Sequence, residues 1–180
     1  AKTDFLRLAR GELIYVGLLR TNLAALLGEV EVDGKRVPLS SELFAIAADA
    51  HLVLGEISEG EYTVETPDGG GKDRDSAGRR LARTVCADPE EIGSEGVEAI
   101  AHQARARQLE LLKEGIRRLA EEHALDLVVA AGIGEGLIGE AARSLDLDCL
   151  RLSEKYGRSV SDLFPAYAVA RLLEVELGGR

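Results

Sequence analysis

The glycine-rich run Gly132-Ile133-Gly134-Glu135-Gly136 is the clearest candidate for binding chemistry in this sequence. It follows the apolar run 125–131 and precedes a helical pattern, so its backbone N–H groups could approach a phosphate or another anion. Leu137 stands where a dinucleotide fingerprint requires glycine, and no Gly-Lys-Ser/Thr completes a P-loop. The alternative is a tight strand-to-helix turn that needs glycine only for its backbone geometry.

Three further polar residues occupy positions where chemistry is expected. Arg20 and Thr21 end the first strand-like run, and strand ends are where an α/β sheet displays its working residues. Arg20 could hold a phosphate or carboxylate through paired hydrogen bonds, and a structural ion pair is the alternative. Asp49 lies inside an otherwise apolar helical run. Because an isolated buried carboxylate is costly, we expect Asp49 to face solvent, to be paired or to face a cleft.

Metal and nucleophile chemistry have little support in the residue spacing. The chain has 3 His and 2 Cys with no zinc-like spacing, and no metal ligand is assigned. Asp49 and His51 are two residues apart, which puts them on nearly opposite faces of a helix and prevents binding to one ion. No local Ser/His/Asp or Cys/His signature is present. Cys86 lies in an apolar stretch and is interpreted as a core residue.

Composition limits the classes of partner. The 180 residues are 46% hydrophobic and carry a formal net charge of -10, which is typical of a globular protein and unsuited to a nucleic-acid backbone. No apolar run reaches the roughly 20 residues of a membrane span. Two isolated cysteines favour a reducing cytoplasm. The absence of Met, even at position 1, is consistent with a segment of a longer polypeptide.

The elements that would position these residues can be predicted from turns and periodicity. Asp33-Gly34 predicts the turn of a hairpin over 29–38, and Ser40 or Ser41 predicts the cap of a helix that Gly55 ends. Residues 58–76 are predicted to be a loop, with a solvated connector as its simplest interpretation. Three helical features are predicted next: a helix over 77–85, a helix start at Asp88-Pro89 and a long helix over 97–123. The last part of the chain is predicted to be a β-loop-α-β-α segment, and its first strand, 125–131, is predicted to be buried on both faces of a sheet.

Five runs in chain order together resemble one known family. The runs are Gly11–Thr21, Glu42–Gly55, Thr66–Gly70, Arg80–Asp88 and Ala131–Glu135. They resemble hydantoinase/oxoprolinase-like proteins of the actin/sugar-kinase/Hsp70 fold, in the archaeal and methylotroph branch linked to methanopterin-dependent one-carbon transfer. The likeness covers essentially the whole chain.

The resemblance implies an α/β fold, namely the C-terminal portion of an actin-like ATPase (ribonuclease H-like) fold. In that view residues 1–85 follow phosphate motifs that this sequence lacks, and residues 86–180 form a connecting helix with a βαβα subdomain. The partner would be the N-terminal half of the same protein, and a homo-oligomer stays open. No nucleic acid or membrane partner is expected.

The resemblance also implies an activity. It implies a transferase of methanofuran biosynthesis that joins γ-glutamyltyramine to an aminomethylfuran methyl diphosphate and releases pyrophosphate, with Mg²⁺ bound mainly outside this sequence. Asp49 and Asp68 would be catalytic, and Arg20, Thr21 and the 132–136 loop would bind substrate or nucleotide. One alternative is an ATP-dependent kinase or a hydantoinase/oxoprolinase-type hydrolase. A second is a non-catalytic interaction or regulatory subunit.

Overall fold

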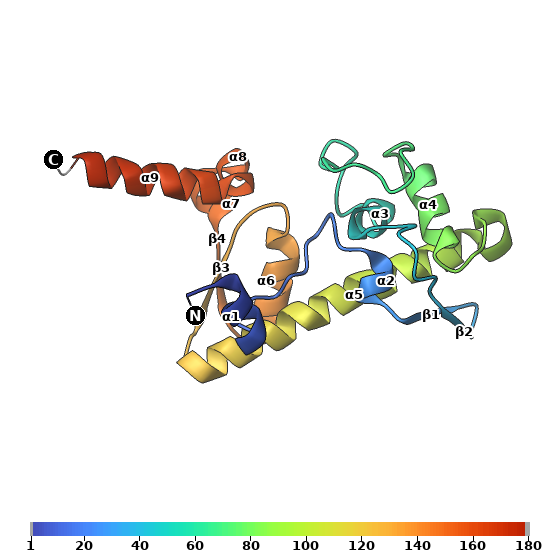
Figure 1. Ribbon diagram of the computed structural model, residues 1–180, viewed down its shortest axis with the longest axis horizontal. Coiled ribbons are helices and arrows are strands. Elements are labelled where there is room, and N and C mark those ends of the chain that lie inside the picture. The colour runs from blue at the N-terminus through green and yellow to red at the C-terminus, as the bar shows by residue number, and fades with distance from the viewer. Residues whose placement is uncertain (1, 179–180) are drawn as a thin grey trace. The chain divides into compact units, whose positions relative to one another are not determined.

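A computed structural model describes residues 2–178 and shows two compact units. The first unit combines the residues up to 12 with those from 112 onward, and the second contains residues 13–111. The sequence predicts a division between residues 85 and 86 instead. The structure divides the chain differently because the long helix α5 (Pro89–His123), drawn in yellow in Figure 1, begins in the second unit and ends in the first.

The second unit is built from short helices and one hairpin. In chain order it contains α2 (Leu23–Leu26), β1 (Glu29–Val32), β2 (Lys35–Pro38), α3 (Ala47–Val53), α4 (Arg74–Arg83) and the first part of α5. The predicted hairpin is confirmed, because β1 and β2 pair antiparallel with Val30 opposite Val37. Asp33 and Gly34 form its turn with φ angles of 50° and 71°. This left-handed geometry suits the twist of a two-residue hairpin.

Helix α3 begins later than the sequence predicts. The predicted cap at Ser40 or Ser41 is wrong, because the helix starts at Ala47. Ile46 is held in an extended conformation (φ -121°, ψ 167°) by a bridge to Asn22, so the preceding residues cannot join the helix. Leu43, which lies between the predicted cap and the observed start, is 54% exposed. All seven residues of α3 are buried, which makes it the centre of the second unit.

Helices α4 and α5 have strong local start signals. Asp73 caps α4 by accepting a hydrogen bond from the Ser76 N–H at 2.9 Å, and the helix begins at Arg74 rather than near Ala77. The predicted start at Asp88-Pro89 is confirmed, since α5 begins at Pro89. Gly93 has non-helical angles (φ 67°, ψ 173°), so the main part of α5 follows this residue. Its buried apolar side chains in the second unit are Val97, Ile100, Ala101 and Ala104.

Cys86 is exposed, which corrects its interpretation as a core residue. It lies just after α4, in a turn where its own φ is 57° and its N–H donates to the Arg83 carbonyl at 2.9 Å. The turn leaves the thiol outside the packed part of the unit.

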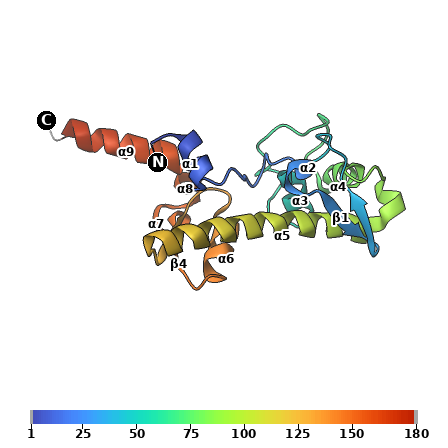
Figure 2. The same ribbon diagram turned by 60° about the horizontal axis from the view of Figure 1, so that its bottom comes forward.

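The first unit contains α1 and the β-loop-α-β-α segment, visible in blue and in orange to red in Figures 1 and 2. Its elements are α1 (Asp4–Arg10), β3 (Leu127–Ala130), α6 (Glu135–Arg143), β4 (Asp148–Arg151), α7 (Leu152–Tyr156), α8 (Arg158–Asp162) and α9 (Phe164–Gly178). Strands β3 and β4 are parallel, with Val128 opposite Cys149, and α6 connects them and packs on both. The predicted β-loop-α-β-α order is therefore confirmed. The chain is a mixed α/β protein.

Strand β3 is less buried than the sequence predicts. Its apolar composition predicted a strand covered on both faces, but Leu127 and Val129 are 49% and 56% exposed. Ala130, on the opposite face, is buried. The described sheet of this unit has only β3 and β4, so residues 2–178 cover one face and leave the other open. None of the helices formed by these residues is both long and apolar enough to cross a membrane.

Candidate functional site

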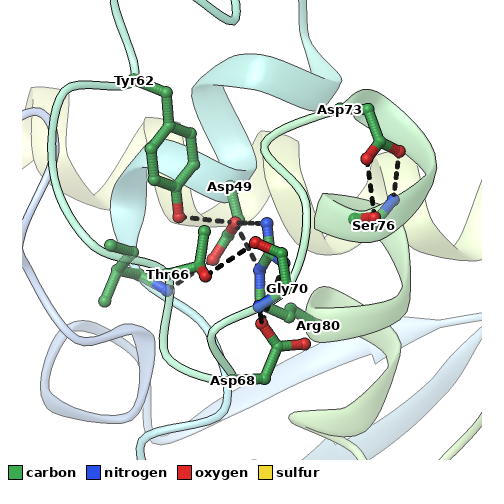
Figure 3. Close-up of polar contacts among 9 residues, drawn as sticks. Asp49, Tyr62, Thr66, Asp68, Gly70, Asp73, Ser76 and Arg80 are labelled. Atoms are coloured by element: carbon green, nitrogen blue, oxygen red, sulfur yellow. Dashed lines mark hydrogen bonds and ion pairs between the residues drawn. The ribbon is translucent and has the colours of Figure 1, made fainter.

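Arg80 joins two carboxylates in the second unit, as Figure 3 shows. It comes from α4, and its Nε donates to Oδ1 of Asp49 on α3 at 2.8 Å. Its Nη1 donates to Oδ1 of Asp68, in the loop between these helices, at 3.1 Å. The side chains of Arg80 and Asp49 are both fully buried, whereas that of Asp68 is 34% exposed. The two predicted catalytic carboxylates therefore share one buried cation.

The buried end of this cluster is firmly held at Asp49. Its Oδ2 accepts the Ile46 N–H at 2.9 Å, and its Oδ1 accepts the Tyr62 hydroxyl at 2.9 Å. Asp49 is also in the first turn of α3, where a negative charge is favoured by the helix dipole. The expectation that Asp49 would be paired if buried is confirmed, and its alternative as a solvated helix charge is wrong. A fully buried carboxylate with these partners cannot touch a substrate within the second unit.

Burial and charge shift the acid–base behaviour of this buried end. Burial raises the pKa of the Asp49 carboxyl, and the hydrogen bonds from Arg80 and Ile46 oppose the rise. Burial and the neighbouring Asp49 charge raise the pKa of Tyr62, so its hydroxyl stays protonated as a donor. Arg80 Nη2 lies 2.8 Å from Asp49 Oδ1, but its N–H groups point at no acceptor among residues 2–178. That contact is therefore electrostatic rather than a hydrogen bond.

Asp68 is the solvent-facing end of the cluster. Its Oδ1 accepts both the Arg80 Nη1 and the Gly70 N–H, the latter at 2.9 Å. The Thr66 hydroxyl donates to the Gly70 carbonyl at 3.1 Å and closes the loop. Oδ2 receives no donor from another residue in the described chain. Partial burial raises the pKa of Asp68, but the Gly70 and Arg80 hydrogen bonds outweigh it and hold that pKa below its usual value.

These contacts change the interpretation of the loop. The simplest sequence interpretation of residues 58–76 was a solvated connector. The structure instead ties the loop to α4 through Asp68 and to α3 through Tyr62. Lys72, also in this loop, lies with its Nζ 5.6 Å from the centre of the Tyr62 ring. The loop is thus fixed to both helices, and its Asp68 carboxylate is partly exposed.

A second buried polar network surrounds His51. Its Nδ1 lies 2.6 Å from Glu56 Oε2, and its Nε2 lies 2.8 Å from Oε1 of Gln108 on α5. The Gln108 Nε2 donates to the Gly17 carbonyl at 3.0 Å. The hydrogen bond from His51, assisted by Arg105, lowers the pKa of Glu56 against the effect of burial. As expected from their spacing, Asp49 and His51 have different partners.

Arg20 and Thr21 lie beside α3 rather than at a strand end. The Thr21 hydroxyl donates to the Gly17 carbonyl and accepts the Gly17 N–H, both at 2.9 Å, so Thr21 closes a turn. The carbonyl of Thr21 accepts the Ala47 N–H at 2.8 Å, which ties this segment to the start of α3. Arg20 is exposed. Its role in anion binding stays a prediction.

The glycine loop, residues 132–136, belongs to the first unit. It differs from the expected anion-binding loop because the side chain of Glu135 is buried within it. Glu135 is only 4% exposed, and its Oε1 accepts the Ser153 N–H at 3.0 Å and the Ser161 hydroxyl. Ser161 in turn accepts the Gly132 N–H at 3.0 Å. Burial raises the pKa of Glu135, but the hydrogen bonds from Ser153 and Ser161 outweigh it and leave that pKa lowered. Glu135 therefore fastens the loop.

The glycines of this loop have different backbone requirements. Gly132 has a φ of 85°, which favours glycine, whereas Gly134 has a φ of -79°. A Cβ placed at Gly134 or Gly136 would meet nothing within 4 Å. The fold alone therefore does not require glycine at position 134. The predicted binding of an anion or nucleotide by this loop stays a prediction.

A hollow of about 320 Å³ lies between the starts of α4 and α5. Its charged lining residues are Arg74, Asp75, Arg79, Glu90 and Glu98. Arg74 donates to Glu98 at 2.8 Å, so part of this charge is already paired. With acidic side chains outnumbering basic ones, the hollow does not favour a phosphate.

Sequence reasoning missed the residues that organise both networks. Arg80, Tyr62, His51 and Gln108 are buried polar side chains to which no role was given. The signal for Arg80 was present, because it lies three residues after Ala77 and directly before Leu81, both fully buried on α4. A charge on the apolar face of a helix requires a buried partner.

Comparison with known proteins places the chain in a family. The hydantoinase/oxoprolinase family model matches residues 1–176. The chain therefore belongs to the hydantoinase/oxoprolinase family, as its motifs predicted.

Two curated relatives make the likeness more specific. Both are named (4-{4-[2-(gamma-L-glutamylamino)ethyl]phenoxymethyl}furan-2-yl)methanamine synthase. The protein from Methanocaldococcus jannaschii is 40% identical over 176 residues, which are 98% of this chain and 53% of that protein. The protein from Methanococcus vannielii is 33% identical over 183 residues, covering 99% of this chain and 82% of that protein. The chain thus spans about half the length of the first relative.

Proposed function

We propose that this chain is part of a transferase of methanofuran biosynthesis. It would join γ-glutamyltyramine to an aminomethylfuran methyl diphosphate and release pyrophosphate in the cytoplasm. The observation that carries this proposal is the 40% identity, over almost the whole chain, to a synthase whose name describes the joined product. We further propose that the chain is the C-terminal portion of an actin-like fold and works with the remaining part of that fold.

The name of the relatives' product defines what the reaction must achieve. Its phenoxymethyl group contains an ether between a phenol oxygen and a methylene on the furan. In the proposed reaction the phenol oxygen forms a bond to that methylene carbon, and the bond from this carbon to the diphosphate oxygen breaks. The electron pair leaves with pyrophosphate, and the phenol proton needs an acceptor. The protein must therefore stabilise the leaving charge and place a base beside the phenol.

Asp68 is the group in the second unit best suited to receive the phenol proton. Its lowered pKa keeps it ionised at neutral pH, and its Oδ2 has no donor from another described residue. An acceptor hydroxyl could therefore donate to Oδ2 without breaking a contact of the fold. In this proposal Asp68 touches the substrate, and the buried Asp49 acts behind it.

The leaving diphosphate would be bound by groups that donate hydrogen bonds. In the second unit the candidate is the exposed Arg20. In the first unit the backbone amides around Gly134 are a separate, alternative candidate. The family resemblance implies Mg²⁺, and residues 2–178 contain no group of three or more His, Cys, Asp or Glu side chains that could hold a metal by themselves. We therefore derive no step of the reaction through it.

The test is an assay of the polypeptide encoded by the complete gene. It is incubated with γ-glutamyltyramine and the aminomethylfuran methyl diphosphate, with and without ATP, and both the ether product and pyrophosphate are measured, with Asp68→Asn as the inactive control. Equal amounts of the two products would support the proposal. Turnover of ATP to ADP without ether formation would favour the kinase or hydrolase alternative. Binding to a second protein without any turnover would favour the regulatory alternative.

A further inference from the structure

We infer that Arg80, fixed from behind by Asp49 and Tyr62, is a positioning residue that turns Asp68 toward the acceptor phenol. This inference rests on the proposed function and assigns a role to a side chain that does not touch substrate. Figure 3 shows the arrangement: Asp49 and Tyr62 lie on one side of the guanidinium and Asp68 on the other.

The inner side of the guanidinium is fixed by a chain of buried contacts. Asp49 is anchored to the backbone of α3 through the Ile46 N–H and to the loop through the Tyr62 hydroxyl. Arg80 Nε donates to the same carboxylate at 2.8 Å. Because the Arg80 and Asp49 side chains are fully buried, water cannot compete for these contacts. The guanidinium plane is therefore held in one orientation, with Nη1 directed at Asp68.

The outer side of the guanidinium selects one oxygen of Asp68. Arg80 Nη1 and the Gly70 N–H both donate to Oδ1, which leaves Oδ2 without a donor from another described residue. Asp68 is followed by three glycines, of which Gly69 has a φ of 68°, so the backbone after Asp68 has wide conformational freedom. Arg80 thus adds a contact from a buried, firmly held side chain to the one that the loop itself makes through Gly70.

The arrangement differs from what stability alone would select. One cation faces two carboxylates, and Nη2 is buried without a well-directed hydrogen bond. Buried ion pairs can generally be replaced by packed apolar side chains without loss of stability. Asp68 is partly exposed and needs no buried partner to be solvated. Arg80 is buried and nevertheless donates a hydrogen bond to the partly exposed Asp68 carboxylate. A need to orient that carboxylate explains this hydrogen bond.

The test removes the guanidinium without leaving an unpaired buried charge. The double variant Asp49→Asn/Arg80→Met eliminates both buried charges. The oxygen of the new amide can accept the Ile46 N–H, and its NH₂ group can donate to the Tyr62 hydroxyl oxygen, which then acts as acceptor. The matched control is Arg83→Met, an exposed arginine on the same helix. In the chain itself, carboxyl ¹³C NMR follows the titration of Asp68. The Asp68 midpoint should move to higher pH in the double variant, because Arg80 helps to lower that pKa, and should not move in the control.

The same variants are then assayed in the polypeptide from the complete gene. A general base contributes about 100-fold or more to rate, so we expect the double variant to lower kcat at least about 10-fold. Its KM for γ-glutamyltyramine should change little, and the acid limb of its kcat/KM profile should move to higher pH. An unchanged kcat and an unmoved profile would overturn the inference and leave the proposed function standing. If the wild-type polypeptide forms no ether, the proposed function fails, and an unmoved Asp68 midpoint would still refute the contact.

Discussion

Removal of Arg80 should destabilise the second unit strongly, and the loss should depend on Asp49. The Arg80→Met substitution leaves the fully buried Asp49 carboxylate without its cation. Breaking a buried pair by removing one partner costs about 3–5 kcal/mol, because the other charge stays desolvated. Asp49 keeps only the Ile46 and Tyr62 donors. We therefore expect the free energy of unfolding of Arg80→Met to fall by about 3–5 kcal/mol at neutral pH.

The other two corners of the double-mutant cycle should behave differently. Asp49→Asn has one amide oxygen, so either the guanidinium or the Ile46 N–H loses its acceptor, while Arg80 keeps its contact with Asp68. A loss of about 1–3 kcal/mol is therefore expected. The double variant carries no unpaired buried charge and should be more stable than Arg80→Met. The coupling between the two sites should therefore exceed the roughly 0.5 kcal/mol seen for independent positions.

The pH dependence of Arg80→Met has a definite sign. Burial raises the pKa of Asp49 in the wild type, and loss of the Arg80 contact should raise it further. A carboxyl whose pKa is raised by folding binds its proton more tightly in the folded state. Stability should therefore fall as pH rises from the unfolded value of about 3.9 to the raised folded value, by at most about 1.4 kcal/mol per unit.

The assay is urea unfolding of the whole chain, followed by circular dichroism, at several pH values. Hydrogen exchange of peptides from α3 and α4 reports separately on the second unit. Arg80→Met within about 1 kcal/mol of the wild type would refute the reasoning, because such a loss is typical of an average substitution rather than a broken buried pair. A double variant as unstable as Arg80→Met would also refute it, since the loss would then not come from Asp49.

Substitutions at four other residues have outcomes that follow from their surroundings. Gly134→Ala should change the free energy of unfolding by no more than about 1 kcal/mol, because position 134 has a negative φ and open space around it. Gly132→Ala should lower it by about 1–2 kcal/mol, because position 132 has a positive φ. Equal losses for the two variants in urea unfolding would contradict this reasoning. Titration of Gly134→Val with inorganic pyrophosphate should show weaker binding than the wild type, and unchanged affinity would favour a plain turn. The Glu56 carboxylate should stabilise the fold fully above its unfolded pKa of about 4.3 and lose that effect as pH falls through its lowered folded pKa. Glu56→Gln should flatten this acid side of the stability curve, and an unaltered curve would exclude the His51 contact as its cause. Tyr62→Phe removes one donor from Asp49 and should cost about 1–3 kcal/mol by thermal unfolding; a neutral effect would show that the hydroxyl contact is absent in solution.

Features that depend on neighbouring residues could be predicted from the sequence. The hairpin follows from Asp33-Gly34, because few residue pairs adopt its left-handed turn easily. The start of α5 follows from Asp88 and Pro89, because Pro is favoured at the first position of a helix and disfavoured in its interior. The parallel pair β3 and β4 follows from an apolar run, a glycine turn and a helix in order. Each signal lies within a few residues of the feature that it produces.

The candidate site could be predicted only in part, because its contacts join distant segments. Asp49 and Asp68 were selected, but the residue that connects them is Arg80, 31 positions after the first and 12 after the second. No local pattern specifies that contact. The start of α3 was misplaced for a similar reason, since the bridge between Ile46 and Asn22 keeps the preceding residues out of the helix.

Strand β3 was predicted correctly from its apolar run, but its predicted burial on both faces was wrong. Its alternate residues divide cleanly, with Leu127 and Val129 on the exposed face and Ala130 on the buried face. A strand with one face in water normally alternates apolar and polar residues, whereas an apolar run without alternation is typical of a strand covered on both faces. Helix α6 packs on the pair β3 and β4, and the described residues leave Leu127 and Val129 open. The composition of β3 is therefore typical of a strand covered on both faces, although residues 2–178 cover only one. This difference agrees with the proposal that the chain, which spans about half the length of its Methanocaldococcus relative, works with the rest of the family fold.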